Sequence, residues 1–534
     1  MKIKVLFTLA ISSVIAISIT GCQKGDLSTN PNAASANAVL PLSLLVNNVT
    51  ANFILPEEFP FGGNVYKYNQ HQVSNYSKYW GDNTYGWSYS NDSYQILKYA
   101  IAIENQAKAQ LGTTNNKYFA LAKFLRAYSA VWFSQKVGDI PMSQAGDPNN
   151  ITPAFDAQKT VYKTALALLD TANTIMNTVN SVAANQNTLF DGGDIFGLTN
   201  LQWQKLFNTY KLRVLISLSK RADDNADLNI KSQFAAIVTN PTLYPFMTST
   251  SDNMVYKFTA ANLYPPFAQG NNAYNNFQNV GETVLSITRS TADPRTFLMA
   301  APSKAGTYNS FSAYVGGNSN LSLTDLQNQA ATNSISAFNG QRYFGTGFVA
   351  TTSLTTYEPF VFIGYSEMCF NIAEGINRGW APSLTAADAA TWYNNGISAS
   401  FKNFGLNTSS NSTINAYSVS GTNLGSLTTD NATFLANVQY NVSDATVALK
   451  QILSQKYVAL FMNSGYEAFM NYRRTGFPVF STNGPGTGTP SGAIPRRWLY
   501  PLSEINYNNA NYLAAVSSQF GGTDDVNKDT WLTK

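Results

Sequence analysis

Several regions of this chain repeat apolar residues at the spacing of an α-helix, and this periodicity constrains the fold more than any other feature. Between residues 117 and 137, for example, Tyr118, Leu121, Leu125 and Trp132 fall on one face. The predicted helices cover residues 94–110, 117–137, 160–177, 201–221, 360–378, 386–401 and a segment that begins at Ser443. Since many neighbouring helices have short connections, we predict a mainly α-helical fold of tetratricopeptide-like helix pairs, although no strict repeat is readable.

Local signals support several of these helix ends. Gly112 is placed just past the end of the first helix, where a left-handed residue is favoured. The second helix is expected to stop before Gly138-Asp139-Ile140-Pro141. Thr385 and Asp388 have the spacing of a capping box at the start of a later helix.

Long stretches without helical periodicity separate these helices. They cover about 55–90, 240–350, 405–440 and 475–534, and they hold a large share of the aromatic residues. Connections of this length usually serve a function or contain small local structure. We therefore predict a helical scaffold at about 90–240 and 355–475, packed against a loop-rich lobe built from the four stretches.

The first 22 residues have the order of a targeting segment. Lys2 and Lys4 precede an apolar run that is shorter than the roughly 18–20 residues needed to span a bilayer. Ile19-Thr20-Gly21-Cys22 resembles the lipobox of bacterial lipoproteins, which implies removal of residues 1–21 and lipidation of Cys22. An ordinary signal peptide with an incidental cysteine is the alternative. Residues 23–26 resemble the tag that directs Bacteroidetes lipoproteins to the cell exterior, and residues 22–35 would form the tether.

The charge balance argues against a nucleic-acid-binding protein. The formal net charge is +4, charged residues make up 12% of the chain, and no basic run occurs. This charged fraction is about half the usual share, and Asn, Ser, Thr and Tyr take its place. A polar but largely uncharged surface suits neutral ligands, although an adaptation for solubility would give the same composition.

The chain lacks the common catalytic and metal-binding motifs. It contains one histidine, His71, and neither an HExxH nor a CxxC motif. No G-x-S-x-G elbow is present, and the adjacent Glu57 and Glu58 cannot flank one glycosidic bond. Two acids remote from each other in the chain could still form a hydrolase site. We expect no catalytic residues, no metal and no cofactor, a structural or surface role for His71 and a buried structural thiol at Cys369.

Ordered motifs across nearly the whole chain resemble the SusD/RagB family of Bacteroidetes outer-membrane lipoproteins. The matching segments are 26–32 (DLSTNPN), 138–145 (GDIPMSQA), 155–162 (FDAQKTVY), 203–208 (WQKLFN) with 212–214 (LRV), 366–367 (SE) with 373–375 (AEG), 455–457 (QKY), 472–478 (YRRTGFP) and 494–501 (IPRRWLYP). Met142 and Gln144 depart from the family pattern. The resemblance implies one SusD-like domain over residues 36–534, with four tetratricopeptide-like helix pairs. It also implies non-catalytic binding of oligosaccharides, or of peptides in some members. The implied partner is a SusC-like TonB-dependent transporter, over which the lipoprotein sits as a hinged lid.

Most of the motif residues are expected to have structural roles. Charged residues in this group should form hydrogen bonds and ion pairs: Asp139, Arg473, Arg474, Arg496 and Arg497. Aromatic residues on helical apolar stripes should belong to the core: Trp132, Trp203 and Tyr457.

The ligand site is expected among loop aromatics. Sugars stack on flat apolar rings that are bordered by amides and hydroxyls. Residues 79–89, 262–267 and 271–277 have this composition. The predicted ligand-binding residues are Trp87, Trp80, Tyr85, Tyr274, Tyr264 and Tyr314. Packing within the lobe is the alternative for each ring.

These features together predict a cell-surface glycan-binding lipoprotein that delivers oligosaccharides to a SusC-like transporter. A neutral or N-acetylated glycan such as a chitin fragment fits the low charge. Three alternatives remain open: a peptide-binding member of the same family, a secreted glycoside hydrolase and a lid without ligand affinity.

Overall fold

This computed structural model of the protein describes residues 39–77, 81–85, 89–147, 149–258, 277–304, 306–344, 358–482, 484–487 and 494–534. Residues Leu42–Lys534 form one compact unit. Its α-helices are α2 Leu42–Ala51, α3 Val65–Tyr68, α5 Tyr94–Leu111, α6 Lys117–Val137, α7 Gln158–Asn180, α8 Ala183–Gln186, α9 Asn200–Ser217, α10 Ile230–Thr239, α13 Glu282–Ser290, α14 Thr296–Met299, α15 Leu323–Ala331, α16 Gly340–Phe344, α17 Tyr365–Asn377, α18 Ala386–Asn403, α19 Asn431–Asn437, α20 Ala445–Ala459, α21 Glu467–Thr475, α22 Leu502–Tyr507 and α23 Asn509–Phe520. Its short 3-10 helices are η2 Pro56–Glu58, η3 Ser219–Arg221, η4 Ala226–Leu228, η5 Thr250–Asp252 and η6 Phe311–Ala313. Its strands are β1 Gln72–Ser74, β2 Met254–Tyr256, β3 Gln278–Val280, β4 Phe360–Ile363, β5 Thr413–Tyr417 and β6 Asn423–Thr428.

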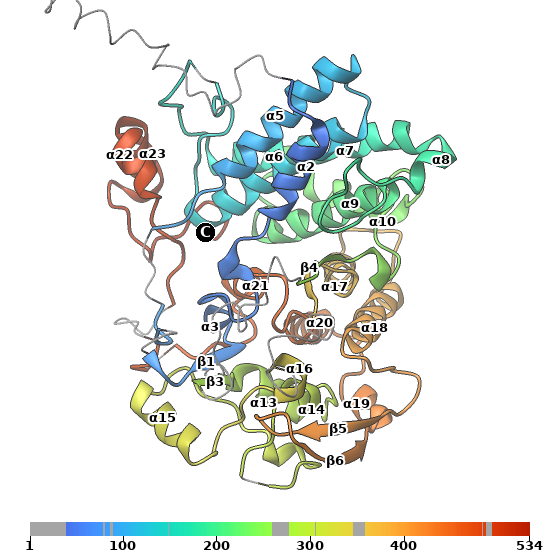
Figure 1. Cartoon of the computed structure of the whole chain (residues 1–534), viewed down its shortest axis with the longest axis vertical. Helices are drawn as coiled ribbons and strands as arrows, with labels where there is room; N and C mark the ends of the chain where they lie inside the picture. The colour runs from blue at the N-terminus through green and yellow to red at the C-terminus, as the bar shows by residue number, and fades with distance from the viewer. Residues whose placement is uncertain are drawn as a thin grey trace, which may run out of the picture. The chain divides into compact units, whose positions relative to one another are not determined.

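The helices form a scaffold of successive packed pairs (Figure 1). Helix α6 packs against α5 and α7, α7 packs against α9, and α17 packs against α9, α18 and α20. Two glycines allow close helix contacts, because a Cβ at Gly375 would meet the ring of Phe234 and one at Gly396 would meet the ring of Phe370. The predicted mainly α-helical fold is confirmed.

Local capping explains where the scaffold helices begin and end. Helix α5 ends at Gly112, which is left-handed with φ of 65°. Helix α6 begins after Asn116, whose side chain accepts a hydrogen bond from the Phe119 N–H at 2.9 Å. Thr385 and Asp388 form the predicted capping box at the start of α18.

The predicted helix at 360–378 is wrong in its first residues. Phe360–Ile363 form strand β4, which pairs antiparallel with β2, and α17 begins only at Tyr365. Phe360, Phe362 and Ile363 are buried. The periodicity of apolar residues cannot distinguish a short buried strand from a buried helical segment. These residues were therefore assigned to the helix that follows them. The stretches predicted to lack helical periodicity also contain helices, among them α13, α15 and α23.

Buried ion pairs join the scaffold helices. Arg213 of α9 donates from Nε to Glu367 Oε1 of α17 at 2.8 Å, and Arg474 of α21 donates from Nη2 to Glu374 Oε2 of α17 at 2.9 Å. Burial alone would raise the pKa of Glu374, but the Arg474 and Arg378 guanidiniums outweigh burial and lower this pKa to about 2.

The other motif residues are also structural, as predicted. Arg473 donates hydrogen bonds to the carbonyl oxygens of Gln135 and Arg496. Arg496 pairs with the Asp529 carboxylate, and Arg497 pairs with the Asp524 carboxylate. The Asp139 carboxylate accepts a hydrogen bond from the backbone N–H of Gln158. Trp203, Tyr457 and the Cys369 thiol are buried in the core. Trp132 is only half-buried, and its ring lies 3.5 Å from the Lys136 ammonium.

Each described strand belongs to a two-stranded antiparallel sheet. The pairs are β1–β3, β2–β4 and β5–β6, and the last is a hairpin in which Thr413 faces Thr428. Helices α13–α16 and the β5–β6 hairpin lie together at one end of this unit (Figure 1). These elements come from two of the four predicted loop-rich stretches, 240–350 and 405–440, and we call this group alone the lobe.

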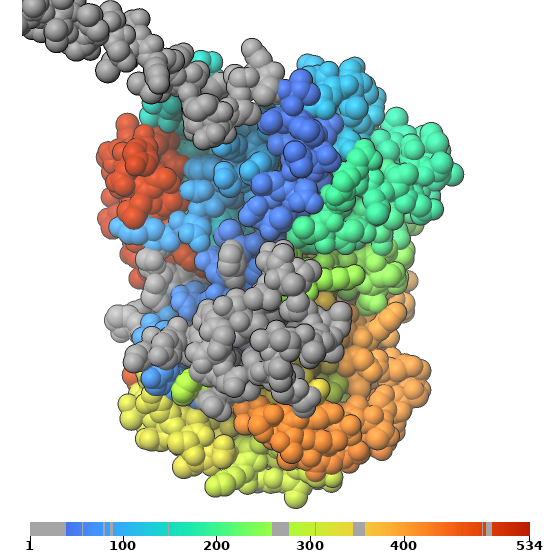
Figure 2. Space-filling model, viewed as in Figure 1, coloured from blue at the N-terminus to red at the C-terminus, as the bar shows by residue number. Residues whose placement is uncertain are grey.

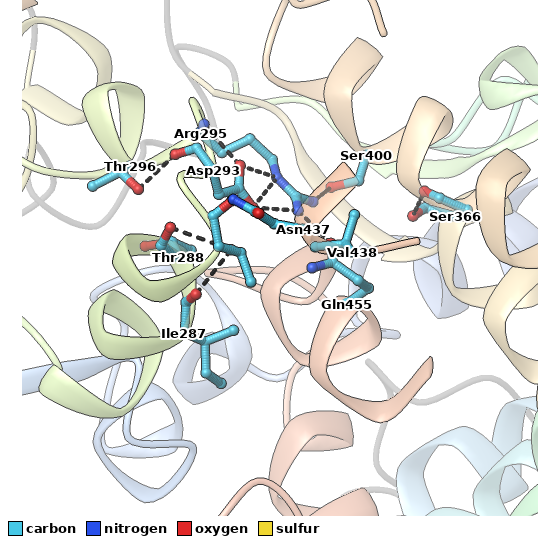
Figure 3. A network of polar contacts seen from close by, with 12 residues as sticks. Ile287, Thr288, Asp293, Arg295, Thr296, Ser366, Ser400, Asn437, Val438 and Gln455 are labelled. Atoms are coloured by element: carbon cyan, nitrogen blue, oxygen red, sulfur yellow. Dashed lines mark hydrogen bonds and ion pairs between the residues drawn. The ribbon is translucent and has the colours of Figure 1, made fainter. Parts of the chain in front are cut away.

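One fully buried guanidinium attaches the lobe to the scaffold (Figure 3). Arg295, just before α14, pairs with Asp293 through Nε–Oδ1 and Nη2–Oδ2 contacts of 3.0 and 2.6 Å. It also donates to Ser400 Oγ of α18 at 2.7 Å and to Gln455 Oε1 of α20 at 2.6 Å. The Arg295 and Asp293 side chains have no exposed surface. Three elements distant in sequence are therefore held by one side chain.

Replacing Arg295 by methionine should lower the free energy of unfolding by about 3–5 kcal/mol, because the Asp293 carboxylate would stay buried without its cation. Urea denaturation of the two proteins measures this difference. Lys231→Met removes a cation from the exposed Lys231–Asp223 pair and should cost less than about 1 kcal/mol. Equal effects of the two substitutions would contradict the central role of Arg295.

Candidate ligand-binding cleft

A cleft of about 900 Å³ lies in the lobe beside α15 and the tip of the β5–β6 hairpin. Figure 2 shows α15 in yellow and the hairpin in orange at the same end of this unit. The volume is within the roughly 300–1,000 Å³ of small-molecule sites. The lining comes from five segments: residues 75–76 after β1, 277–279 at β3, 301–308 after α14, 327–337 from α15 onward, and 418–424 at the hairpin tip.

A stacked aromatic pair forms one side of the cleft. The rings of Tyr76 and Phe277 have centroids 4.3 Å apart at an interplanar angle of 20°, and both residues are half-buried. The backbone N–H of Asn75 donates to the Phe277 carbonyl at 3.0 Å, and Asn75 Nδ2 donates to Asn279 Oδ1 at 2.8 Å. The pairing of β1 with β3 therefore sets both the rings and the amides.

The wall made by residues 301–308 is held from behind by Tyr314. The Tyr314 side chain is fully buried, its ring meets Phe297 edge-on at 5.1 Å, and its hydroxyl donates to the Tyr308 carbonyl at 2.7 Å. Two backbone bonds add to this support, from Ser303 N–H to the Ala313 carbonyl and from Lys304 N–H to the Asn333 carbonyl. Tyr314 thus positions the wall without facing the ligand space.

Tyr308 links this wall to the hairpin. A Cβ at position 425 would lie 2.3 Å from the Tyr308 hydroxyl oxygen, so Gly425, with φ of 141°, allows the ring to approach the hairpin backbone. Tyr308 is half-buried and lines the cleft. It therefore offers an aromatic surface that the predicted residue set missed.

The lining combines apolar surface with neutral hydrogen-bonding groups. Its uncharged polar side chains are Asn75, Asn279, Ser303, Thr307, Gln327, Asn333 and Ser418. Among the described lining residues, Lys304 is the one charged side chain and none is a carboxylate. Such a surface can hold a neutral polar ligand through ring contacts and amide or hydroxyl hydrogen bonds.

The structure describes two of the six predicted ligand-binding residues, and it buries both. Tyr85 donates from its hydroxyl to the Tyr68 carbonyl at 2.9 Å, and its ring stacks on that of Tyr68. Tyr314 has the supporting role given above. These burials do not support the predicted stacking role of either ring. The other four predicted ligand-binding residues lie outside the described residues: Trp80, Trp87, Tyr264 and Tyr274. The predicted lipidation site, Cys22, also lies outside them.

Sequence reasoning could have found part of the observed lining. Phe277 closes the aromatic segment 271–277, and Tyr76 lies three residues before the start of segment 79–89. Tyr308 stands in Gly306-Thr307-Tyr308-Asn309, which has the loop composition of the predicted sites but only one aromatic ring. The predicted sites were segments with several aromatic residues, so one aromatic residue in a polar loop did not distinguish this segment from other loops.

The one histidine of the chain, His71, lies in the core. In the sequence it is four residues before Asn75, which lines the cleft. His71 immediately precedes β1, its ring centroid is 4.5 Å from that of Tyr457, and it has no exposed surface. Neither ring nitrogen has a hydrogen-bond partner among the described residues. Burial lowers the pKa of His71 to about 3. His71 is therefore a structural residue.

Comparison with known proteins identifies the family. Residues 43–501 match the SusD-like family described as "Starch-binding associating with outer membrane". This match spans most of the chain, so the protein belongs to the SusD-like family. No curated protein sequence matches the chain.

Solved structures agree with this assignment. A SusD homologue from Bacteroides fragilis has a TM-score of 0.76 and 28% identity, covering 93% of this chain and 100% of its own. A second B. fragilis homologue has a TM-score of 0.71 and 26% identity, covering 93% and 99%. A chitin-binding SusD homologue from Flavobacterium johnsoniae has a TM-score of 0.68 and 19% identity, covering 92% and 98%, and shares the fold.

The described part of the chain contains neither a candidate membrane-spanning helix nor a candidate metal site. No helix there is long and apolar enough to cross a bilayer. Within the same residues, no group of three or more His, Cys, Asp or Glu side chains is arranged to hold a metal ion.

The His71 imidazole should not titrate near its usual pKa of about 6.5 in the folded protein. Because the unfolded chain takes up this proton between about pH 6.5 and 3 while the folded chain does not, stability should fall as pH drops through this window, by on the order of 4 kcal/mol. Ring resonances from histidine-labelled protein measure the titration. The same protein in urea is the control and should titrate normally. A folded-state midpoint near 6.5 would contradict the buried, neutral assignment.

Proposed function

We propose that this protein binds neutral glycans at the cell surface, without chemical change, and passes them to a SusC-like TonB-dependent transporter in the outer membrane. The cleft carries this proposal, because its described lining joins aromatic rings with neutral amides and hydroxyls. Glycoside hydrolysis requires two carboxyl groups across the scissile bond. The described lining offers none, which favours binding over catalysis.

An N-acetylated glycan is the ligand that we favour within this class. Amide side chains that line the cleft and are exposed, Gln327 and Asn333, supply the donors and acceptors that acetamido groups use. The chitin-binding function of the Flavobacterium johnsoniae homologue supports the same choice. Trp80, Trp87, Tyr264 and Tyr274 remain proposed stacking residues.

Placement at the outer membrane follows from the family and from the predicted lipobox. The family description names outer-membrane association. Lipidation of Cys22 would tether the mature chain, and the tag at residues 23–26 would direct it outward. A SusC-like transporter is the expected partner.

Peptide binding is the second candidate. Lys304 is exposed in the cleft and could pair with a peptide carboxylate. A peptide ligand should then lose affinity in Lys304→Gln, whereas a neutral glycan should not.

Tyr308→Ala should weaken binding of a chitooligosaccharide by on the order of tenfold, because a buried aromatic contact is lost. Isothermal titration calorimetry over a panel of chito-, cello- and malto-oligosaccharides measures this loss. Trp87→Ala and Tyr274→Ala test the predicted stacking residues in the same assay.

Tyr507→Ala is the matched control, because Tyr507 is an exposed tyrosine on α22 and does not line the cleft. Unchanged affinity in Tyr308→Ala, Trp87→Ala and Tyr274→Ala would refute the site. Binding of short peptides alone would refute the ligand class, and release of new reducing ends would refute non-catalytic binding.

A further inference from the structure

A second groove, of about 440 Å³, lies on elements that the glycan cleft does not use. It is formed by the first turns of α5, by residues 145–146, 151 and 153, and by helix α22 with Asn508. In Figure 1 these elements belong to the scaffold end of the unit, whereas the cleft belongs to the lobe. The groove is thus a separate surface.

The groove has an apolar wall and an exposed apolar rim. Leu97 and Ile101 of α5 line it together with Pro153. On the rim, Ile151 is 86% exposed and Tyr507 is 79% exposed. Large apolar side chains with this degree of exposure around a concave surface are typical of sites that bind a partner.

A nearly buried carboxylate without a cation also lines the groove. Glu504 is 5% exposed, and it accepts hydrogen bonds from the Tyr94 hydroxyl and, at 3.0 Å, from Asn508 Nδ2. Burial and the neighbouring Asp92 carboxylate raise the pKa of Glu504, and among the described residues no cation acts on this pKa. Lys98 also lines the groove but is exposed on α5.

We propose that this groove binds a lysine or arginine side chain of a partner protein. The methylene stem would lie against Leu97, Ile101 and Tyr507, as long cationic side chains do on apolar surfaces. The cationic head would pair with Glu504 and stabilise its charged form. A neutral glycan would leave this carboxylate uncompensated, and a purely apolar side chain would do the same. The inference goes beyond glycan binding and does not depend on it.

The test compares two peptides that differ only in charge, Ac-Gly-Arg-Gly-NH₂ and its citrulline counterpart. Saturation-transfer difference NMR with the full-length protein gives their dissociation constants. The arginine peptide should bind at least about tenfold more tightly than the citrulline peptide, because only its head is a cation. Glu504→Gln should remove this preference.

Variants on the exposed rim separate a binding effect from misfolding. Tyr507→Ala and Ile151→Ser remove side chains with little buried surface, and each should weaken the arginine peptide severalfold while leaving the melting temperature unchanged. Asp223→Asn, which removes an exposed carboxylate elsewhere, should have no effect on affinity.

Equal affinity for the two peptides, a preference that survives Glu504→Gln, or the absence of saturable binding would each overturn the proposal. A chitooligosaccharide that competes with the arginine peptide would overturn it as well. Affinity of the lobe cleft for glycan should stay unchanged in Glu504→Gln, so failure of this proposal and failure of the glycan function give different results.

Discussion

The buried guanidinium of Arg295 makes the contacts on which the position of the candidate cleft depends. It is buried without exposed surface, and its donors are shared between Asp293 beside α14, Ser400 of α18 and Gln455 of α20. A buried charge of this kind is tolerated only in the geometry that satisfies it. Because the cleft wall at residues 301–308 directly follows α14, the geometry that satisfies Arg295 also sets the wall relative to the helical scaffold.

Charged and neutral polar side chains have different roles in this chain. Charged residues are few, and some of them form buried pairs, such as Arg213–Glu367 and Arg474–Glu374, that join helices. The polar side chains that line the cleft are, apart from Lys304, neutral amides and hydroxyls. Desolvation costs neutral polar groups less free energy than it costs charged groups, and neutral groups can form hydrogen bonds with sugar hydroxyls and acetamido groups. The low charge of the sequence is thus compatible with both the scaffold and the proposed ligand.

The sequence predicted best what is set locally. Helix ends at Gly112 and Thr385 depend on the backbone within one turn, and both are where they were expected. The start of α17 was missed because Phe360–Ile363 owe their strand to pairing with β2, which lies far away in the chain. Tyr85 and Tyr314 were placed at the ligand because composition cannot tell a buried ring from an exposed one. Tyr308 was missed because its position against the hairpin depends on Gly425, which is distant in sequence.

The central claim is that a neutral glycan lies in the lobe cleft, and hydrogen-exchange mass spectrometry with and without a saturating chitooligosaccharide tests it most directly. Backbone amides at 75–77, 301–313 and 418–424 should exchange more slowly in the presence of the sugar, because these segments line or support the cleft. The scaffold helices α5–α9 should not change. Protection confined to α5 and α22, or no protection despite saturation, would contradict the placement of the ligand in this cleft.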